Sequence, residues 1–472
     1  MRRLALAAAA VTISALACGG RAAPVRAPPA SLGAVDYAIA FDDRAGDVTG
    51  VARLPPGSPT AVSIDDPLLP YVADVAVTEP ADAGPVRRVA DRFDVPPVCA
   101  ARGCTLRYRV RLREACRQIG QVDTASVESP DVLEAPPSSW LLVPEGAAGA
   151  TRVRFAVTTP PGWSFATGVY GAAAGWEIAL ADIYTSPYSA FGRLRTSEIE
   201  VGGARLHLAI GGATPKRGDG VVARWVTDAA RAVTAYFGRF PVPEPLVLVV
   251  VDSGDDVMMG KSLSGGGASV LVHVGDDVTP EDLARDWVMT HEMVHTGFPA
   301  QPRQRDWIEE GLATYVEPFA RLRIGQLGAE EVWRSFTWGM PQGLPEAGDR
   351  GLDNTHTWGR TYWGGALFLL VADVEIRKRT QGKASLETAL RAILAAGGNN
   401  AVRWELERAL DVGDAATGTG VLRELHRAWG ASPVAYDVAG LFRELGVRRV
   451  GRAVTFDDAA PLAAMRRSME GK

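Results

Sequence analysis

The sequence predicts a multidomain α+β protein with an N-terminal β-sandwich-like domain, a central α/β domain and a C-terminal helical domain. The chain has 472 residues, which is longer than a protein with a single compact core usually is. Short alternating apolar runs, separated by Pro, Gly and Asp, predominate up to about residue 212. Beyond that point apolar residues recur mostly at helical spacing. Both periodicities in one long chain indicate a β-rich part followed by a mixed and then a helical part.

The N-terminus has the organisation of an export signal. Arg2 and Arg3 form a positive head, residues 4–16 are apolar, and small residues precede Cys18. The apolar run is too short to span a bilayer as a mature helix. We therefore expect a signal peptide over residues 1–17 and export to the periplasm or cell envelope, or secretion.

Two fates are open for the residues that follow the signal. The ending ALAC resembles a lipoprotein box, which would place a lipid on Cys18 and anchor the protein to a membrane. Residues 18–33, rich in Gly, Pro and Ala, would then be a flexible tether. The alternative is plain secretion with the same segment as an unanchored linker.

The other cysteines are Cys99, Cys104 and Cys116, and in an exported chain they indicate one disulfide and one unpaired thiol. The sequence leaves the pairing and the oligomeric state open. The net charge of −5 is small for this length and there is no basic run. Nothing therefore supports a nucleic-acid partner.

The N-terminal β-rich domain is expected over residues 34–212. Alternating runs at 105–112, 152–157 and 205–210 indicate half-buried strands. No long amphipathic helix is visible in this part, which favours a sandwich of short strands.

The central domain is expected over residues 213–330. Residues 221–237 have helical spacing, and the β-branched run 245–251 predicts a buried strand. A Gly-rich turn at 265–268 leads into a second strand at 269–274. One helix is then expected from Asp282 to Thr296.

The last part, residues 331–472, is expected to be mainly helical. A further helix begins near Trp307, before this part starts, and helical spacing continues to Leu445. The run 447–456 predicts a single final strand.

Residues 291–295 read HEMVH, the pattern that most clearly indicates chemistry in this chain. Histidines four residues apart on a helix project from one face, so His291 and His295 can bind one Zn²⁺. Glu292 between them can act as a base on a water molecule. A catalytic zinc needs a third protein ligand and an open position, and the next helix offers both Glu309 and Glu310.

The segment WIEEGLATY (307–315) resembles the W-x-x-E-G-x-A/T-x-Y segment of gluzincin zinc metallopeptidases. In that group the Glu directly before Gly is a zinc ligand, so the resemblance selects Glu310. Glu309 is then a neighbour at the helix start, where a negative charge is favourable.

Further segments are similar to the glycyl aminopeptidase family of gluzincins, which is related to alanyl aminopeptidases. They are ADIYTSPYSAFG (181–192), YFGRFP (236–241) and TYWGGALFLLVADVEIRKRTQGKASLETALRAI (361–393). The resemblance covers about residues 180–450 and implies a thermolysin-like zinc domain. Because few residues follow this stretch, we expect the protein to lack the PDZ domain that this family often carries. Tyr362 matches the tyrosine that hydrogen-bonds the tetrahedral intermediate in the related aminopeptidases.

The export signal, the HEMVH motif and the resemblance to gluzincins together predict an exported zinc metallopeptidase, with one Zn²⁺ and a peptide or protein substrate. Glu292 would move the proton and Tyr362 would stabilise the oxyanion. Relatives carry a Glu on a Gly-rich edge strand before the zinc helix, and this Glu holds the free amino terminus of the substrate. By resemblance, the corresponding stretch in this chain is Gly265–Ser269, and it has no acid. Capture of a free amine would then need Asp255, Asp256 or another acid.

Two other functions remain open from the sequence. The missing acid favours a catalytically weakened relative that acts as an envelope binding or assembly protein. The same zinc site could also hydrolyse a non-peptide bond. Of the remaining histidines, His273 is expected to be structural and His356 lies in a loop before Tyr362. His207 and His426 belong to no group of candidate site residues.

Overall fold

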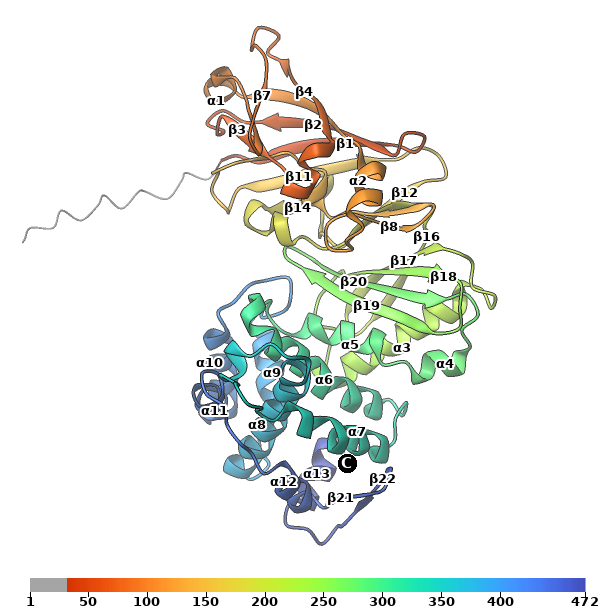
Figure 1. Ribbon diagram of the computed structural model, residues 1–472, viewed down its shortest axis with the longest axis vertical. Coiled ribbons are helices and arrows are strands. Elements are labelled where there is room, and N and C mark those ends of the chain that lie inside the picture. Colours follow the sequence, from red (N-terminus) through yellow and green to blue (C-terminus); the bar gives the residue numbers. More distant parts are fainter. Residues whose placement is uncertain (1–31, 472) are drawn as a thin grey trace, which may run out of the picture.

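The computed structural model describes residues 32–471 (Figure 1). A β-rich part lies at one end, a five-stranded sheet follows it, and helices form the other end. The predicted signal peptide and Cys18 lie outside the described residues. No helix among the described residues is long and apolar enough to cross a membrane.

The N-terminal part is built on a seven-stranded sheet. Successive side chains alternate between buried and exposed, as expected for a sheet with one buried face. In β1 (Val35–Asp42) every second side chain, from Val35 to Phe41, is buried. The sheet order is β13-β14-β11-β1-β2-β7-β4. The other strands are β2 (Asp47–Leu54), β4 (Val72–Glu79), β7 (Cys104–Val110), β11 (Arg152–Thr158), β13 (Gly171–Ala172) and β14 (Gly175–Ala179).

Two four-stranded sheets and two short helices complete this part, which confirms the predicted β-rich domain. Aromatic side chains that include Trp140, Phe155 and Phe191 fill the core between them. One sheet contains β10 (Val143–Pro144), β3 (Ala61–Ser63), β6 (Arg92–Asp94) and β5 (Arg87–Val89), and the other contains β12 (Ser164–Thr167), β15 (Ser189–Gly192), β9 (Val132–Glu134) and β8 (Ser126–Ser129). The helices are α1 (Pro97–Arg102) and α2 (Leu112–Ile119).

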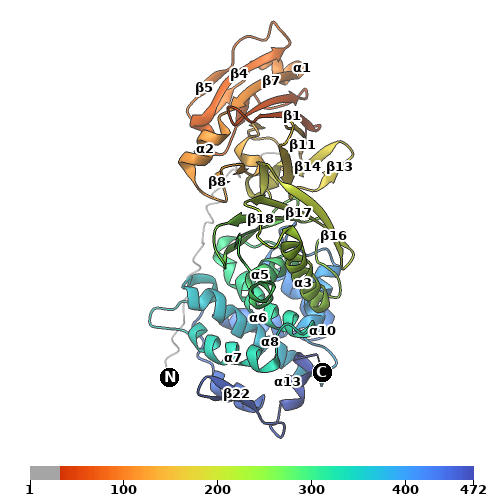
Figure 2. The same cartoon turned by 90° about the vertical axis from the view of Figure 1, so that its right-hand side faces the viewer.

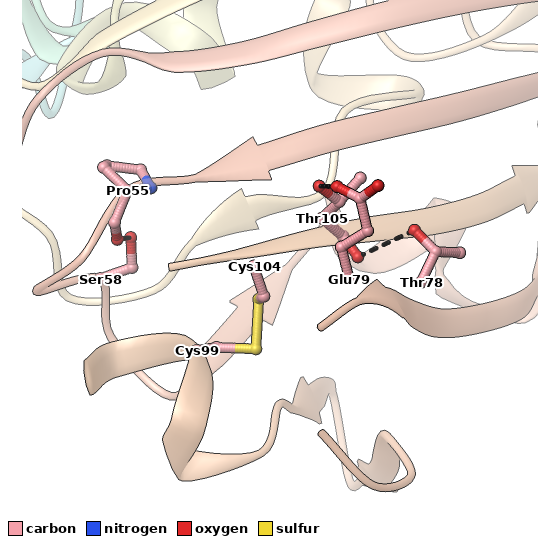
Figure 3. Close-up of a disulfide and its surroundings, with 7 residues drawn as sticks. All are labelled: Pro55, Ser58, Thr78, Glu79, Cys99, Cys104 and Thr105. Carbon is pink, nitrogen blue, oxygen red and sulfur yellow. Dashed lines mark hydrogen bonds between the residues drawn. A yellow bond between two sulfur atoms is a disulfide. The ribbon is translucent and has the colours of Figure 1, made fainter. Parts of the chain in front are cut away.

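The cysteine pairing that the sequence left open is Cys99 with Cys104 (Figure 3). The bond joins α1 to the first residue of β7, across the turn between them. Cys116 is a free thiol buried in α2. Burial raises the pKa of its thiol, so Cys116 stays protonated and unreactive.

The central sheet has the order β16-β17-β18-β20-β19. Its strands are β16 (Arg195–Val201), β17 (Ala204–Gly212), β18 (Leu246–Asp252), β19 (Val257–Ser264) and β20 (Ala268–Gly275). The helix α3 (Asp219–Phe237) connects the parallel strands β17 and β18. The predicted boundary at residue 212 therefore falls inside a sheet, because β16 and β17 pair with the strands of the central domain.

The strand β19 is an edge strand that the sequence analysis did not predict. It pairs antiparallel with β20 and packs against the helix that carries HEMVH. The match of Gly265–Ser269 to the edge strand of relatives is wrong, whereas the Gly-rich turn and the strand after it are confirmed to within one residue. Gly265–Gly267 lie in the turn after β19, and Ala268 and Ser269 begin the interior strand β20.

The glycines of this turn have a packing role. A Cβ on Gly267 would lie 2.1 Å from the carbonyl oxygen of Gly168, and one on Gly265 would lie 2.6 Å from that of Thr185. Both contacts are with the N-terminal part. Only glycine allows the turn to approach the N-terminal backbone so closely.

The helix expected over 282–296 is two helices, α4 (Pro280–Arg285) and α5 (Val288–Val294). The break is at Asp286, whose backbone is extended. Its carboxylate accepts hydrogen bonds from the backbone N–H groups of Val288 and Met289 and from the indole of Trp225. Asp286 thus caps α5 and ends α4, because Asp competes with the helical backbone for such hydrogen bonds.

The C-terminal part is helical, as predicted (Figure 2). One hydrophobic core runs from the central sheet into these helices. The helices are α6 (Asp306–Arg323), α7 (Ala329–Gly339), the π-helix η8 (Gly359–Gly364), α8 (Gly365–Thr380), α9 (Leu386–Ala395), α10 (Leu406–Thr417), α11 (Val421–Trp429), α12 (Val438–Glu444) and α13 (Ala463–Met469). Short 3₁₀ turns are η1 (Asp66–Tyr71), η2 (Pro137–Ser139), η3 (Leu180–Thr185), η4 (His295–Gly297), η5 (Arg303–Arg305), η6 (Met340–Gly343) and η7 (Leu352–Asn354).

The single final strand expected at 447–456 is a hairpin of β21 (Val447–Val450) and β22 (Ala453–Phe456). Gly451 has a φ of +62° in the turn, a conformation that glycine adopts without strain. The continuous apolar and basic pattern of this segment concealed the turn.

Candidate metal centre

The structure brings together His291, His295 and Glu310, the residues that the sequence analysis selected as metal ligands. One donor atom from each lies within 4.8 Å of the others. Nε2 of His291 is 3.2 Å from Oε2 of Glu310, and Nε2 of His295 is 3.7 Å from the same oxygen. Donors bound to one tetrahedral zinc at ~2.0–2.1 Å are separated by roughly 3.4 Å, so the set suits that ion.

The helices α5 and α6 create this arrangement. The two histidines lie one turn apart, His291 in α5 and His295 at the start of η4 directly after it, with ring centroids 5.1 Å apart. The α6 helix packs against both α5 and α8. Gly311 makes the second contact close, since a Cβ there would lie 2.4 Å from the Cα of Gly365 on α8. Glu310, the residue before Gly311, is thereby held opposite the two histidines.

Burial and charge set the protonation of the ligands in the metal-free chain. Burial lowers the pKa of His295 to about 4, so its imidazole is neutral and able to bind a metal. Burial also opposes a charge on His291, but its hydrogen bond to Glu310 leaves its pKa raised. The pKa of Glu310 is lowered: burial works against the charge, and His295 and His291 outweigh it.

Glu292 lies beside the ligands and under the edge strand. It is 8% exposed. A Cβ on Gly260 of β19 would lie 2.8 Å from Cγ of Glu292, so this strand covers the carboxylate closely. Burial raises the pKa of Glu292 to about 7. A carboxyl group with a pKa near neutrality can both accept and release a proton.

Tyr362 lies on the other side of His291, in η8. Their rings are stacked with centroids 6.2 Å apart and an interplanar angle of 21°. Burial and the nearby Glu310 and Glu292 raise the pKa of Tyr362, so the phenol keeps its proton and remains a donor. A buried ion pair of 2.7 Å between Arg360 and Asp349 holds η8 in place.

The remaining predicted residues lie apart from the three ligands. Glu309 is half-buried next to Glu310, and burial raises its pKa to about 8. His356 is exposed, and Asp255 and Asp256 lie in the exposed turn between β18 and β19.

His273 is not a metal ligand candidate either. It is held between two carboxylates, 2.6 Å from Glu128 and 2.7 Å from Asp252. Within residues 32–471, one group of three side chains has donor atoms close enough to share a metal ion, and it consists of His291, His295 and Glu310.

Sequence reasoning missed an ion pair next to the candidate site. Lys261 on β19 donates to the carboxylate of Asp123 at 2.8 Å. The other carboxylate oxygen of Asp123 accepts the hydroxyl of Tyr188 at 2.8 Å. Asp123 belongs to the N-terminal part, more than a hundred residues earlier, so no local pattern could have revealed the pair.

Two tryptophans beside the site were also missed. Trp287 is 5.1 Å from His291, edge to face, and Trp358 stacks on Tyr362 at 6.0 Å. Helical spacing could have identified the first, because Trp287 precedes His291 by the same four residues that separate the two histidines.

Comparison with known proteins gives matches in structure alone. No protein-family profile and no curated protein sequence matches the chain. An aminopeptidase N family protein from Idiomarina loihiensis aligns with a TM-score of 0.65 at 14% identity, over 88% of this chain and 78% of that one. An M1 zinc metallopeptidase from Deinococcus radiodurans aligns with a TM-score of 0.51 at 16% identity, over 86% of this chain and 95% of that one.

A third structure, native yeast LTA4 hydrolase, aligns with a TM-score of 0.50 at 13% identity, over 88% of this chain and 70% of that one. The Deinococcus protein is also known as a mutant bound to a Tyr-Ser-Ala substrate. The chain thus has the multidomain fold of M1 zinc metallopeptidases. This confirms the predicted multidomain α+β class.

Proposed function

We propose that this protein is a zinc-dependent metallopeptidase. The observation that carries the proposal is the convergence of His291, His295 and Glu310 within 4.8 Å, with Glu292 adjacent. Two imidazoles and one carboxylate are a ligand set of catalytic zinc, which keeps a fourth position open. The likeness to M1 zinc metallopeptidase structures supports the same function.

The three ligands would hold one Zn²⁺. Zinc supplies Lewis acidity when bound, since it lowers the pKa of a coordinated water to about 7 and polarises a carbonyl group. Neutral His295 and ionised Glu310 are already in the protonation states that binding requires.

The chain's own residues would move the proton and stabilise the charge. Glu292, with its buried carboxylate beside the ligands, would accept the proton of the attacking water and return it to the leaving amine. Tyr362, protonated and stacked on His291, would donate a hydrogen bond to the oxyanion that develops on the substrate.

The substrate would be a peptide, such as the Deinococcus structure binds. We infer that the requirement for a free amino terminus is weak. The edge strand β19 reads VMMGKSLS and carries Lys261 in place of an acid. Asp123, the acid that pairs with Lys261, is also engaged by Tyr188. An ammonium group would have to displace Lys261, whereas an extended peptide could still pair with the strand edge.

We extend the proposal to the family branch and the location of this protein. The segments that resemble the glycyl aminopeptidase family favour that branch of the gluzincins. The N-terminal signal favours export to the cell envelope, with a lipid on Cys18 as one outcome. A catalytically weakened binding protein, or hydrolysis of a non-peptide bond, are the alternatives that experiment must separate.

The test combines metal analysis with hydrolysis of a quenched peptide library. We expect one zinc per chain and cleavage that falls by about 10²–10⁴-fold in Glu292→Gln, the usual contribution of general acid–base catalysis. Glu292→Gln should keep its zinc. Bound zinc without cleavage of any peptide would favour the binding protein or another hydrolase, and a chain that binds no zinc would refute the proposal.

A paired set of peptides tests the free-amine inference. The same sequences with free and acetylated amino termini should differ little in kcat/KM. A strict requirement for the free amine would contradict the inference, and Asp123→Asn would then test whether Asp123 is the anchor.

A further inference from the structure

Two solvent-exposed tryptophans stand beside the candidate site. The chain has 12 tryptophans, and Trp287, Trp338 and Trp358 are the ones exposed by more than half, at 52%, 53% and 57%. The others are buried or half-buried. Folding normally buries an indole, because its large apolar surface is costly to leave in water. An exposed indole next to a candidate site can therefore gain from contact with a bound molecule.

Trp287 lies on the same face of α5 as the metal ligands. Its carbonyl oxygen accepts the backbone N–H of His291 at 3.0 Å, so it forms the first turn of the helix. Residues 287, 291 and 295 are spaced four apart and share one face. The ring of Trp287 is 5.1 Å from that of His291, at an interplanar angle of 88°.

Trp358 has the same relation to Tyr362 on the opposite side. It precedes Tyr362 by four residues, at the start of η8. The two rings are stacked, with centroids 6.0 Å apart and an interplanar angle of 28°. Tyr362 in turn stacks on His291 at 6.2 Å. The four rings therefore form a continuous strip, with His291 and Tyr362 in the middle and an exposed indole at each end.

We propose that Trp287 and Trp358 bind an aromatic or large aliphatic side chain of the substrate residue next to the cleaved bond. The inference rests on the proposed peptidase function. A substrate bound at His291 and Tyr362 would lie beside the exposed indoles, and a flat apolar side chain would bury them. A small side chain such as that of Gly or Ala would leave them in water.

The charged groups near the site favour this substrate class over a charged one. The cation on β19, Lys261, is paired with Asp123. The indoles carry no charge, and their ring partners are His291 and Tyr362. Apolar contact is thus the main interaction that these two residues can offer.

The test measures kcat/KM of the zinc-loaded protein on blocked peptides that differ only at the residues flanking the cleaved bond. We expect Phe or Leu at one flanking position to exceed Ala by about tenfold or more. Trp287→Ala and Trp358→Ala should each remove most of this preference, chiefly through KM. The loss on Phe or Leu peptides should exceed the loss on Ala peptides by about tenfold. Trp287→Phe and Trp358→Phe should restore part of the preference.

Trp338→Ala is the matched control. Trp338 is equally exposed, and its ring meets Trp363 rather than a candidate site residue. It should leave the preference unchanged. A wild-type protein that cleaves Ala and Phe peptides equally would overturn the inference while leaving the peptidase function in place. An equal loss on small and large substrates in the Trp287 and Trp358 variants would also overturn it.

Binding provides a readout that is independent of turnover. Calorimetry with Glu292→Gln should show tighter binding of acetylated Phe-Phe amide than of Ala-Ala amide. The difference should disappear when Trp287→Ala is added. If no peptide is cleaved but this binding difference persists, the peptidase function fails and the aromatic subsite stands. If peptides are cleaved and the difference is absent, the subsite fails alone.

Discussion

At the residue scale, adjacent glutamates with different surroundings have different expected roles. Glu310 faces two imidazoles that lower its pKa, whereas burial raises the pKa of Glu309 to about 8. The first is therefore an ionised ligand candidate, and the second is mostly neutral at pH 7. The sequence alone could not separate them without the resemblance to gluzincins.

These surroundings predict opposite effects of the same substitution. Glu310→Gln should lower zinc affinity by more than the 10–100-fold that loss of a supporting residue around a metal typically costs, since it removes a ligand itself. Glu309→Gln should retain zinc, because a neutral carboxyl and an amide are similar in shape and charge. Zinc titration of the two variants measures the difference. Equal zinc loss in both would refute the assignment of Glu310.

Tyr362 allows a second prediction at this scale. Tyr362→Phe keeps the ring that stacks on His291 and removes the hydroxyl. Loss of one oxyanion donor typically lowers kcat by about 10²–10³-fold, so kcat should fall while zinc content and KM change little. Steady-state kinetics with metal analysis provide the measurement. An unchanged kcat would show that Tyr362 serves packing alone.

At the scale of elements, the break between α4 and α5 positions the helix that carries the candidate metal ligand His291. Asp286 accepts hydrogen bonds from two backbone N–H groups of α5 and from Trp225 on α3. It thus fixes both the first turn of α5 and the attachment of that helix to the core. If α4 and α5 were one continuous helix, Asp286 would lie inside it and could not accept hydrogen bonds from the first turn of α5.

Removal of this cap should weaken folding and metal binding together. Asp286→Ala should lower the free energy of unfolding by about 1–2 kcal/mol, the usual loss for a helix cap. Asp286→Asn keeps an acceptor oxygen and should cost less. Denaturant unfolding with and without zinc measures both effects. If Ala and Asn behaved alike, hydrogen bonding by Asp286 would not be the cause.

At the scale of the whole molecule, charged contacts join the N-terminal part to the central sheet. His273 on β20 lies between Asp252 of the same sheet and Glu128 of β8. Burial lowers its pKa, but the hydrogen bonds and charges of the two carboxylates outweigh burial, and the pKa is raised. Lys261 and Asp123 form a second ion pair between the same two parts.

The raised pKa of His273 predicts how stability depends on pH. Because the folded protein holds the proton more tightly, this contact stabilises the fold fully below the unfolded pKa of about 6.5. The contribution is lost as the pH rises through the higher folded value. His273→Gln should remove this part of the pH dependence, as should Glu128→Gln.

Unfolding followed in denaturant below and above that range measures the effect. The wild type should lose more stability than the His273→Gln variant as the pH rises. A stability profile that is identical in the wild type and the variant would contradict the prediction. His207→Gln, at a half-exposed histidine of β17, is the matched control.

The zinc motif and the class of fold were predictable because they depend on local order. Four-residue spacing puts His291 and His295 on one helix face whatever surrounds the helix, and alternating or helical periodicity identifies most elements. The strand β19 was not predictable, because VMMGKSLS has neither alternation nor β-branched enrichment and is a strand through pairing with β20. Gly265–Gly267 were misassigned for a similar reason, since their role is contact with the N-terminal part.

The sequence by itself therefore determined two candidate metal ligands, the candidate base and the order of β-rich, mixed and helical parts. The tertiary structure decided what depends on distant segments. It brought Glu310 to the histidines, paired Cys99 with Cys104, placed Lys261 against Asp123 and left Trp287 and Trp358 exposed beside the site. The physical reason is that periodicity encodes which face of an element is buried, whereas contacts between elements are set by packing of the whole chain.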